Sequence, residues 1–288
     1  MRSVIELPEL EAAAGSQDTD ITIEWGRLPG QMADSVEVEP LMRVAKGRFQ
    51  FNAPAGRYQA RGGKQIVIDP RPSASARDIR LYLLGTTLAA LCHQRALLPL
   101  HGAAIGWIQQ AFAVIGPSGA GKSTLAAQLQ SQGRTVLADD LCVVDIAGDH
   151  AVWVRPGLAR IKLWKQSPAL VGRMADNLEP IGDGIDKFSL PILTPGVRRA
   201  LPLDRIYVLR PGASKTISLT RLSGPEAVGA ILDNIYRWPL AVAMGVSAAE
   251  FAQALALAER CEIVEIGVTH DATAPWKLFE AIERGKLT

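Results

Sequence analysis

The segment 116–124 constrains the fold of this chain more than any other feature of its sequence. It reads G-P-S-G-A-G-K-S-T and fits the pattern G-x-x-x-x-G-K-[ST], with an apolar run before it and a helical pattern after it. Glycines let the backbone turn tightly and direct its N–H groups inward, where a polyphosphate binds at the helix start. The segment predicts a phosphate-binding loop whose nucleotide contacts come from Gly116, Pro117, Ser118, Gly119, Ala120, Gly121, Lys122, Ser123 and Thr124.

Two residues of this loop have distinct chemistry. Lys122 carries a point charge that reaches the terminal phosphates, and the Ser123 hydroxyl is a ligand suited to Mg²⁺. The alternative is a glycine-rich turn that matches by chance, which the flanking strand and helix disfavour. The loop alone predicts nucleotide binding and does not separate a kinase from an ATPase or a GTPase.

A pair of acids follows the next apolar run. Leu137 and Ala138 lead directly into Asp139 and Asp140, as a strand that carries a carboxylate to the phosphates and their magnesium would. Two adjacent carboxylates can divide the work, one holding metal and the other accepting a proton from an attacking hydroxyl. An acidic turn between two strands is the alternative interpretation.

Three further residues are candidates for the site. His101 precedes the loop strand within an apolar run, where a lone histidine is more often part of the core. Arg160 and Lys162 alternate with apolar residues, so they share one face of an extended segment. Cations there could steady a phosphoryl group or an acidic substrate, or they could form a solvated strand face.

The pattern of the chain predicts an α/β fold with two parts. Short strands dominate residues 1–75, including a hairpin around Gly62 and Gly63, and we expect a small β-rich N-terminal unit there. A capping box at Ser75 opens a helix over 76–94, and the loop domain spans 76–288. Further helices are expected at 122–132, 225–236, 248–259 behind a capping box at Ser247, and 275–284. Further strands are expected at 111–115, 135–138, 141–144, 205–209 and 216–220.

Composition excludes several classes of protein. The 288 residues carry 31 basic and 29 acidic side chains, so a net charge of +2 gives no field that would attract nucleic acid or an anionic membrane. Three widely spaced cysteines favour a reducing compartment over a disulfide scaffold. The most apolar run, 81–92, is too short to span a bilayer, and no signal peptide is visible. We therefore expect a cytoplasmic protein.

These motifs together resemble a known family. His101-Gly102, the loop, Gln132-Gly133-Arg134 and Ala138-Asp139-Asp140 follow one another as in HPr kinase/phosphorylase, over roughly residues 98–144. Farther along, Pro156-Gly157 and the run from Arg160 to Trp164 are similar to the diverged HPr-kinase-like serine kinases, some of which belong to lasso-peptide biosynthesis clusters. The resemblance implies a P-loop core of the HPr-kinase-like, carboxykinase-like type.

The resemblance also implies an activity and residue roles. It implies ATP-dependent phosphorylation of a serine hydroxyl on a peptide or protein, with Mg²⁺ as cofactor. By position, Lys122 and Ser123 would bind phosphate and magnesium, Asp139 would be the catalytic base, Asp140 would help to bind the metal, and His101 would tune the base. From the cation pattern, Arg160 is a further catalytic candidate.

The chain departs from the family at one motif. The bifunctional enzymes carry a glutamate where this chain has Trp153, so the resemblance does not extend to phosphorylase activity or to HPr as substrate. Two other functions stay open on the sequence alone: a P-loop NTPase switch or binding module, and a small-molecule kinase or carboxykinase. A homo-oligomer also stays open.

Overall fold

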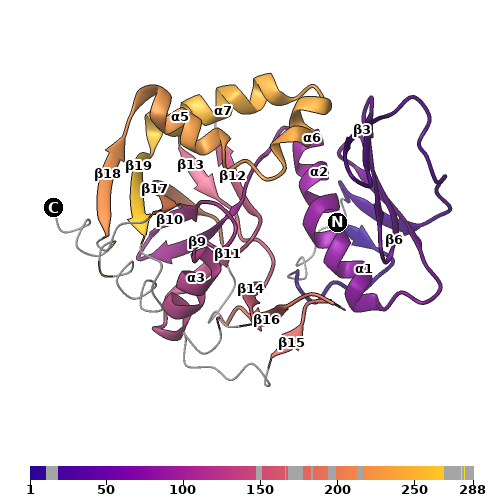
Figure 1. Ribbon diagram of the computed structural model, residues 1–288, viewed down its shortest axis with the longest axis horizontal. Coiled ribbons are helices and arrows are strands. Elements are labelled where there is room, and N and C mark those ends of the chain that lie inside the picture. Colours follow the sequence, from indigo (N-terminus) through magenta and orange to yellow (C-terminus); the bar gives the residue numbers. More distant parts are fainter. Residues whose placement is uncertain are drawn as a thin grey trace.

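In the computed structural model, the chain forms two large β-sheets with helices against each, and a smaller third sheet (Figure 1). The structure describes residues 1–10, 19–146, 151–165, 167, 178–182, 184–193, 199–212, 217–268, 280 and 282. Sheets and helices alternate along the chain, which confirms the predicted α/β class.

The first sheet contains seven strands and uses only residues before Arg71. Its order is β1-β2-β7-β6-β5-β4-β3, and β3 to β7 form an antiparallel meander that includes the predicted hairpin at Gly62 and Gly63. Both glycines have positive φ, of 53° and 68°, as a tight turn requires. The strands are β1 Arg2–Ser3, β2 Thr22–Trp25, β3 Val36–Glu39, β4 Met42–Ala45, β5 Arg48–Ala53, β6 Gly56–Arg61 and β7 Gln65–Pro70.

A helical layer covers one face of the first sheet. The predicted helix over 76–94 is present as α1 (Ala76–Tyr82), a π-helical turn η1 (Leu83–Thr87) and α2 (Leu88–Gln94). Ser75 caps α1 by accepting a hydrogen bond from the Asp78 backbone N at 3.1 Å, as the capping box predicts. Apolar side chains of this layer share one buried core with the sheet: Phe49, Phe51, Tyr58, Ile66, Ile68, Ile79, Leu83, Leu84 and Leu91.

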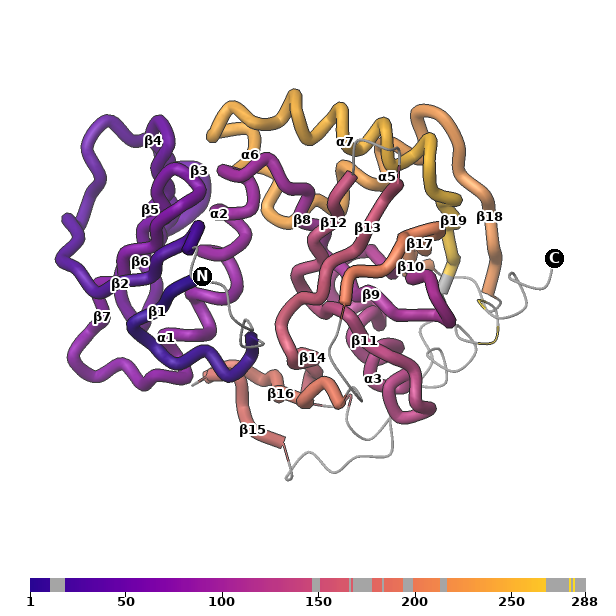
Figure 2. The backbone as a smooth tube through the Cα atoms, turned by 180° about the vertical axis from the view of Figure 1, so that it is seen from behind, coloured from indigo at the N-terminus to yellow at the C-terminus, as the bar shows by residue number. Residues whose placement is uncertain are grey.

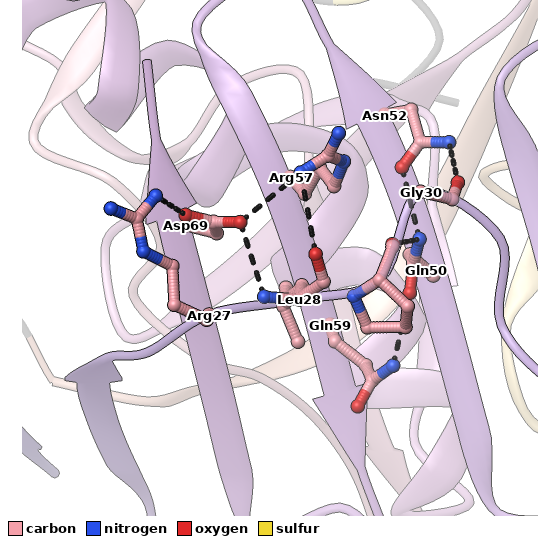
Figure 3. A network of polar contacts seen from close by, with 9 residues as sticks. Arg27, Leu28, Gly30, Gln50, Asn52, Arg57, Gln59 and Asp69 are labelled. Carbon is pink, nitrogen blue, oxygen red and sulfur yellow. Dashed lines mark hydrogen bonds and ion pairs between the residues drawn. The ribbon is translucent and has the colours of Figure 1, made fainter. Parts of the chain in front are cut away.

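The other face of the first sheet carries a polar network (Figure 3). The Asp69 carboxylate accepts hydrogen bonds from the backbone N of Leu28 at 3.1 Å and from Arg57 at 3.2 Å, and it pairs with Arg27 at 3.4 Å. Gln50 donates to the carbonyl of Pro29 at 2.9 Å. Because these side chains bind backbone atoms, they hold the chain after β2 across this face.

The second sheet has nine strands and carries the predicted loop. Its main order is β11-β9-β10-β17-β13-β12-β8, and β19 extends it by pairing with β17 and β18. β10 and β19 both run parallel to β17, whereas β9 runs antiparallel between β10 and β11. The strands are β8 Leu98–Leu100, β9 Gly102–Trp107, β10 Gln110–Ile115, β11 Thr135–Ala138, β12 Cys142–Ile146, β13 Val152–Val154, β17 Leu201–Pro211, β18 Ser218–Leu222 and β19 Glu262–Val268.

Helices cover both faces of the second sheet (Figure 1). α3 (Lys122–Ser131) packs Leu125 and Leu129 against one face, while α5 (Gly224–Leu232) and α7 (Ser247–Arg260) pack Ile231 and Leu257 against the other. α6 (Trp238–Ala243) connects these to the first unit, since its Leu240 belongs to the core of the first sheet. Because helices cover both faces of the sheet, the side chains of β10 are buried on both of its faces, except at Gln110.

A third, small sheet lies below the second in the view of Figure 1. β14 (Arg160–Trp164), β16 (Lys187–Pro191) and β15 (Glu179–Pro180) pair antiparallel in the order β14-β16-β15. The strand predicted at 216–220 is present with shifted bounds, and the helix predicted over 225–236 ends at Leu232. The helix predicted over 275–284 lies outside the described residues except for Glu280 and Ile282.

One sequence prediction about a helix start is wrong. α7 begins at Ser247, but the residue before it, Val246, is the N-cap, and no side chain caps this end. Glu250 does not close a capping box because its carboxylate is buried and lies 2.5 Å from His93 of α2. In the described part of the chain, no helix is long and apolar enough to cross a bilayer.

Candidate active site

The predicted site residues meet at one edge of the second sheet. β10 and β11 both end there, and β9 begins there because it runs antiparallel between them, with Gly102 paired to Ile115 and Ala104 to Ala138. The loop, the acid pair and His101 each sit immediately beyond one of these strand ends. The topology therefore brings together three motifs that are separate in the sequence.

The loop has the backbone that its glycines predict. Gly116, Gly119 and Gly121 have φ values of 148°, 84° and 97°, a region that other residues rarely adopt. A side chain at Gly116 would also lie 2.8 Å from the carbonyl oxygen of Leu209. At Gly119 and Gly121, in contrast, an added Cβ would meet no described atom within 4 Å, so the loop borders open space.

The remaining loop residues divide between surface and interior. Pro117 and Ser118 are exposed, whereas Ala120 and Thr124 are buried. The Thr124 hydroxyl donates to the hydroxyl of Ser167 at 3.4 Å. α3 starts directly after Gly121 with no side-chain cap, so its first backbone N–H groups have no partner from a capping side chain.

Lys122 lies inside the loop and is 6% exposed. Its ammonium donates hydrogen bonds to the carbonyl oxygens of Gly116 at 2.6 Å and Pro117 at 2.8 Å. Burial lowers the pKa of this amine to about 8, although the nearby Asp139 and Asp140 carboxylates act to raise it. The cation is thus held by the same backbone that surrounds the predicted phosphate position.

Asp139 is a buried carboxylate whose charge is incompletely balanced. It is 2% exposed, and its Oδ2 accepts a hydrogen bond from the backbone N of Lys162 at 2.8 Å. Its Oδ1 has no hydrogen-bond partner among the described residues. Burial and the charge of Asp140 raise its pKa to about 6, while the Ser123 hydroxyl beside it acts in the opposite direction.

Asp140 has the opposite environment. Its Oδ2 accepts a hydrogen bond from the Lys162 ammonium at 2.6 Å. Burial alone would raise its pKa, but Lys162, His101 and Lys187 lower it to about 2. Its backbone is left-handed, with φ of 70°, which an aspartate tolerates better than most residues. Asp140 is therefore ionised throughout the physiological pH range.

His101 lies against Asp140. Its Nδ1 is 3.3 Å from the Asp140 carbonyl oxygen and 3.8 Å from the carboxylate Oδ1. Its backbone N donates to the carbonyl of Asn234, and its ring packs edge-on against Tyr236 with 5.6 Å between centroids. Burial and Lys122 lower the pKa of the imidazole, while Asp140 acts to raise it.

Two glycines let these segments approach each other. A Cβ on Gly102, which follows His101, would lie 2.7 Å from the Val114 carbonyl oxygen. A Cβ on Gly157 would lie 2.9 Å from the Cβ of Ala138, where the acid pair begins. This close contact places the segment that leads into β14 beside Asp139 and Asp140. Lys162 of β14 can therefore contact both acids.

The two predicted cations have different positions. Arg160 and Lys162 are 5% and 9% exposed, so a solvated strand face is wrong. Lys162 contacts both acids, whereas Arg160 pairs with the Glu9 carboxylate at 3.1 Å. Sequence reasoning missed Glu9, which lies 151 positions away, and Tyr236, because neither belongs to a recognisable motif. The alternation of cationic and apolar residues was the signal for Lys162.

Oxygen ligands for a divalent cation exist at one point of the site. Asp139 Oδ1 has no partner among described residues and lies on the carboxylate that the Ser123 hydroxyl approaches. Carboxylate and hydroxyl oxygens together with phosphate oxygens are the ligands that Mg²⁺ takes in nucleotide sites. Within the described residues, no group of three or more His, Cys, Asp or Glu side chains could hold a metal without such a phosphate.

Comparisons with known proteins add little to this geometry. No protein-family model matches the sequence, and a search of the curated proteins found no match. Among solved structures, the chain is similar to the Hpr(Ser) kinase/phosphatase from Coxiella burnetii, with a TM-score of 0.34 and 11% sequence identity over 66% of this chain and 96% of that chain. A TM-score this low does not establish a shared fold, so the residue roles rest on the site itself.

Proposed function

We propose that this protein is an ATP-dependent kinase that transfers the γ-phosphoryl group to a hydroxyl, in particular a serine hydroxyl, of a peptide or protein. The observation that carries this proposal is the meeting of a glycine loop, a buried lysine and two unlike carboxylates at one sheet edge. Phosphoryl transfer depends mainly on positioning and charge neutralisation, and these groups provide both.

The loop and Lys122 bind the triphosphate. The loop borders open space at Gly119 and Gly121, the first turn of α3 has no side-chain cap, and the Lys122 ammonium is held by the loop carbonyl of Gly116. Lys122 then exchanges its carbonyl partners for phosphate oxygens, which bind a cation more strongly than a carbonyl does.

Asp139 and Ser123 are the residues that fit Mg²⁺. The unpartnered Oδ1 of Asp139 and its raised pKa both mark a buried negative charge that a cation would balance. Mg²⁺ held by these residues would neutralise negative charge on the phosphates. This assignment exchanges the roles that family resemblance gives to Asp139 and Asp140.

Asp140 is then the carboxylate that receives the acceptor hydroxyl. Asp140 is partly exposed, whereas Asp139 is buried. The hydroxyl oxygen bonds to the γ-phosphorus, the bond from that phosphorus to the bridging oxygen breaks, and ADP leaves. Asp140 orients the hydroxyl and takes its proton late, and Lys162 and His101 hold the carboxylate in place.

Calorimetric titration with Mg-ATP tests the nucleotide site. We expect Lys122→Ala to weaken binding by about ten- to a hundredfold, since hydrogen bonds to charged groups contribute about 1.5–3 kcal/mol. Lys64→Ala, which removes an exposed lysine of the first sheet, is the matched control and should bind as the wild type does. Equal affinity in all three proteins would rule out the assignment of the loop.

A further inference from the structure

An unusual ion cluster lies where the first unit meets the site. It contains Glu9, which follows β1, Arg80 of α1 and Arg160 at the start of β14. The Glu9 Oε1 atom is 3.0 Å from Arg80 Nε and 3.1 Å from Arg160 Nη1. Figure 2 shows the indigo tube of the first residues running past α1 towards β14. The chain thus places one of its own carboxylates between two arginines.

The hydrogen bonding of this cluster is incomplete. One carboxylate oxygen serves both guanidinium groups, while the other, Oε2, is buried and has no partner among described residues. Arg160 is 5% exposed, and its Nε and Nη2 atoms also have no partner within the described chain. An arginine and a carboxylate normally pair through two parallel hydrogen bonds, so the fit of Glu9 to Arg160 is poor for a purely structural pair.

The cluster adjoins the reactive groups. Arg160 and Lys162 are separated by one residue on β14, so their side chains lie on the same side of that strand. The Lys162 ammonium contacts Asp140. Burial lowers the pKa of Arg160, but the charges of Asp140 and Asp139 both act to raise it, so Arg160 lies on the side of β14 that faces the acids. A charged group of a bound acceptor could therefore reach Arg160 while its hydroxyl meets Asp140.

The segment that carries Glu9 also contacts the site through its backbone. The carbonyl oxygen of Glu9 accepts a hydrogen bond from the backbone N of Ala159 at 2.7 Å, immediately before Arg160. Glu9 lies in a turn closed by a hydrogen bond from the Leu10 backbone N to the Leu7 carbonyl oxygen, and this turn presents its side chain and its carbonyl oxygen to the same place. The N-terminal segment makes both contacts at once.

We propose that Arg80 and Arg160 form a subsite for an acidic side chain of the acceptor peptide, and that Glu9 of the same chain occupies it as an internal stand-in. The proposal rests on the proposed function for the identity of the acceptor. It assigns the acceptor as a peptide with Asp or Glu close to the phosphorylated hydroxyl. Removing the Glu9 charge opens the subsite to such a peptide.

Binding of two matched peptides without nucleotide tests the subsite. One fluorescein-labelled peptide has a single serine flanked by glutamates, and its twin has glutamines at the same positions. By fluorescence anisotropy, we expect Glu9→Gln to raise affinity for the glutamate peptide at least about tenfold, which corresponds to about 1.4 kcal/mol. Affinity for the glutamine twin should stay unchanged.

Three further variants make the result specific. Glu9→Asp keeps the charge on a shorter side chain, so it should raise the affinity for the glutamate peptide by less than Glu9→Gln does. It replaces Glu9→Gln in the test if that variant does not fold. The double variant Glu9→Gln with Arg160→Gln should lose the gain in affinity for the glutamate peptide. Because Glu9 is replaced as well, this variant does not leave a buried carboxylate without its arginine. Arg27→Gln removes an exposed arginine of the first sheet and should behave as the wild type.

The outcomes separate this proposal from the proposed function. If Glu9→Gln and Glu9→Asp both fold and neither changes the ratio of the two affinities, the cluster is only structural and the subsite is wrong. If the gain appears but the protein does not bind Mg-ATP, the kinase assignment fails while the acidic-peptide subsite stands. Circular dichroism melts of each variant establish that it is folded.

Discussion

Two adjacent aspartates show how strongly position alone can change one side chain. Asp139 is buried and has one oxygen without a hydrogen-bond partner among the described residues, whereas Asp140 accepts a hydrogen bond from the Lys162 ammonium. The pKa of Asp139 is consequently raised to about 6, and that of Asp140 is lowered to about 2. Buried carboxylates of this kind are where catalytic roles concentrate.

These opposite shifts predict opposite effects on stability. Folded Asp139 binds its proton more tightly than the unfolded chain does, so its contribution becomes destabilising as pH rises from about 4 to 6. Folded Asp140 binds its proton less tightly, so its contribution stabilises above about pH 4 and is lost below. At pH 7.5 without Mg²⁺, we expect Asp139→Asn to gain and Asp140→Asn to lose about 1–3 kcal/mol of unfolding free energy.

Urea unfolding of the two variants and the wild type at pH 7.5 measures this contrast. Repeating it at pH 4 is the internal control, because Asp139 is then protonated in the folded protein and about half protonated in the unfolded chain, so its variant should match the wild type within about 0.5 kcal/mol. Equal destabilisation of both variants at pH 7.5 would mean that Asp139 is not an unbalanced buried charge.

Single residues also mark the limit of the sequence interpretation. The loop and the acid pair were predicted because each is a local pattern with a chemical reason, whereas the role of His101 was predicted from the family resemblance. Glu9 could not be predicted, since its partners Arg80 and Arg160 are 71 and 151 positions away. The role of Lys162 was visible only as one of two cations, and the structure separates it from Arg160.

At the scale of elements, the antiparallel strand β9 decides how the site is assembled. Apolar runs predicted β10 and β11, but their spacing could not show that β9 lies between them. Without that order, His101 would not share an edge with the loop. Strand order depends on contacts between distant segments, which a local pattern does not contain.

The start of α7 is the element where a local pattern misled. Ser247 and Glu250 have capping-box spacing, yet Glu250 is fully buried beside His93. Both ring nitrogens of His93 face oxygen atoms, with Nδ1 at 2.5 Å from the Glu250 carboxylate and Nε2 at 2.9 Å from the Tyr236 carbonyl oxygen. The pair ties α2 to α7 and fixes Tyr236, which packs on His101.

Single substitutions of Glu250 and Ser247 distinguish a buried pair between Glu250 and His93 from a capping box at the start of α7. We expect Glu250→Ala to lower the free energy of unfolding by about 3–5 kcal/mol, because it leaves a buried polar partner uncompensated. Ser247→Ala should cost less than about 0.5 kcal/mol, since this side chain caps nothing. Denaturant unfolding gives both values, and a loss of about 1 kcal/mol or more for each would favour a capping box instead.

At the scale of the molecule, the two units share a core. The helical layer over 76–94 packs on the first sheet, and Leu158 and Leu240 from the later chain join the same cluster. The predicted division at residue 75 therefore separates the strands of the first sheet from the helices that cover them. The change from short strands to a capping box at Ser75 located this boundary, but such a local pattern carries no information about which face a helix covers.

A shortened chain tests how far the units depend on each other. We expect residues 76–288 alone to be insoluble or to lack a cooperative thermal transition, because Ile79, Leu83, Leu84 and Leu91 would lose the sheet that buries them. Expression of this fragment followed by a circular dichroism melt provides the measurement. A soluble fragment that melts at the temperature of the full chain would show that the first sheet is an independent attachment.

The central claim is that the site transfers phosphate to a hydroxyl, and single-turnover transfer from ATP labelled at the γ-phosphate to the serine peptides tests it most directly. We expect an acid-stable phosphoserine product, with a rate about 10²–10⁴ lower in Asp140→Asn than in the wild type, the range for loss of a general base. Release of labelled inorganic phosphate with no labelled peptide, at the same rate in both proteins, would contradict the account and indicate an NTPase.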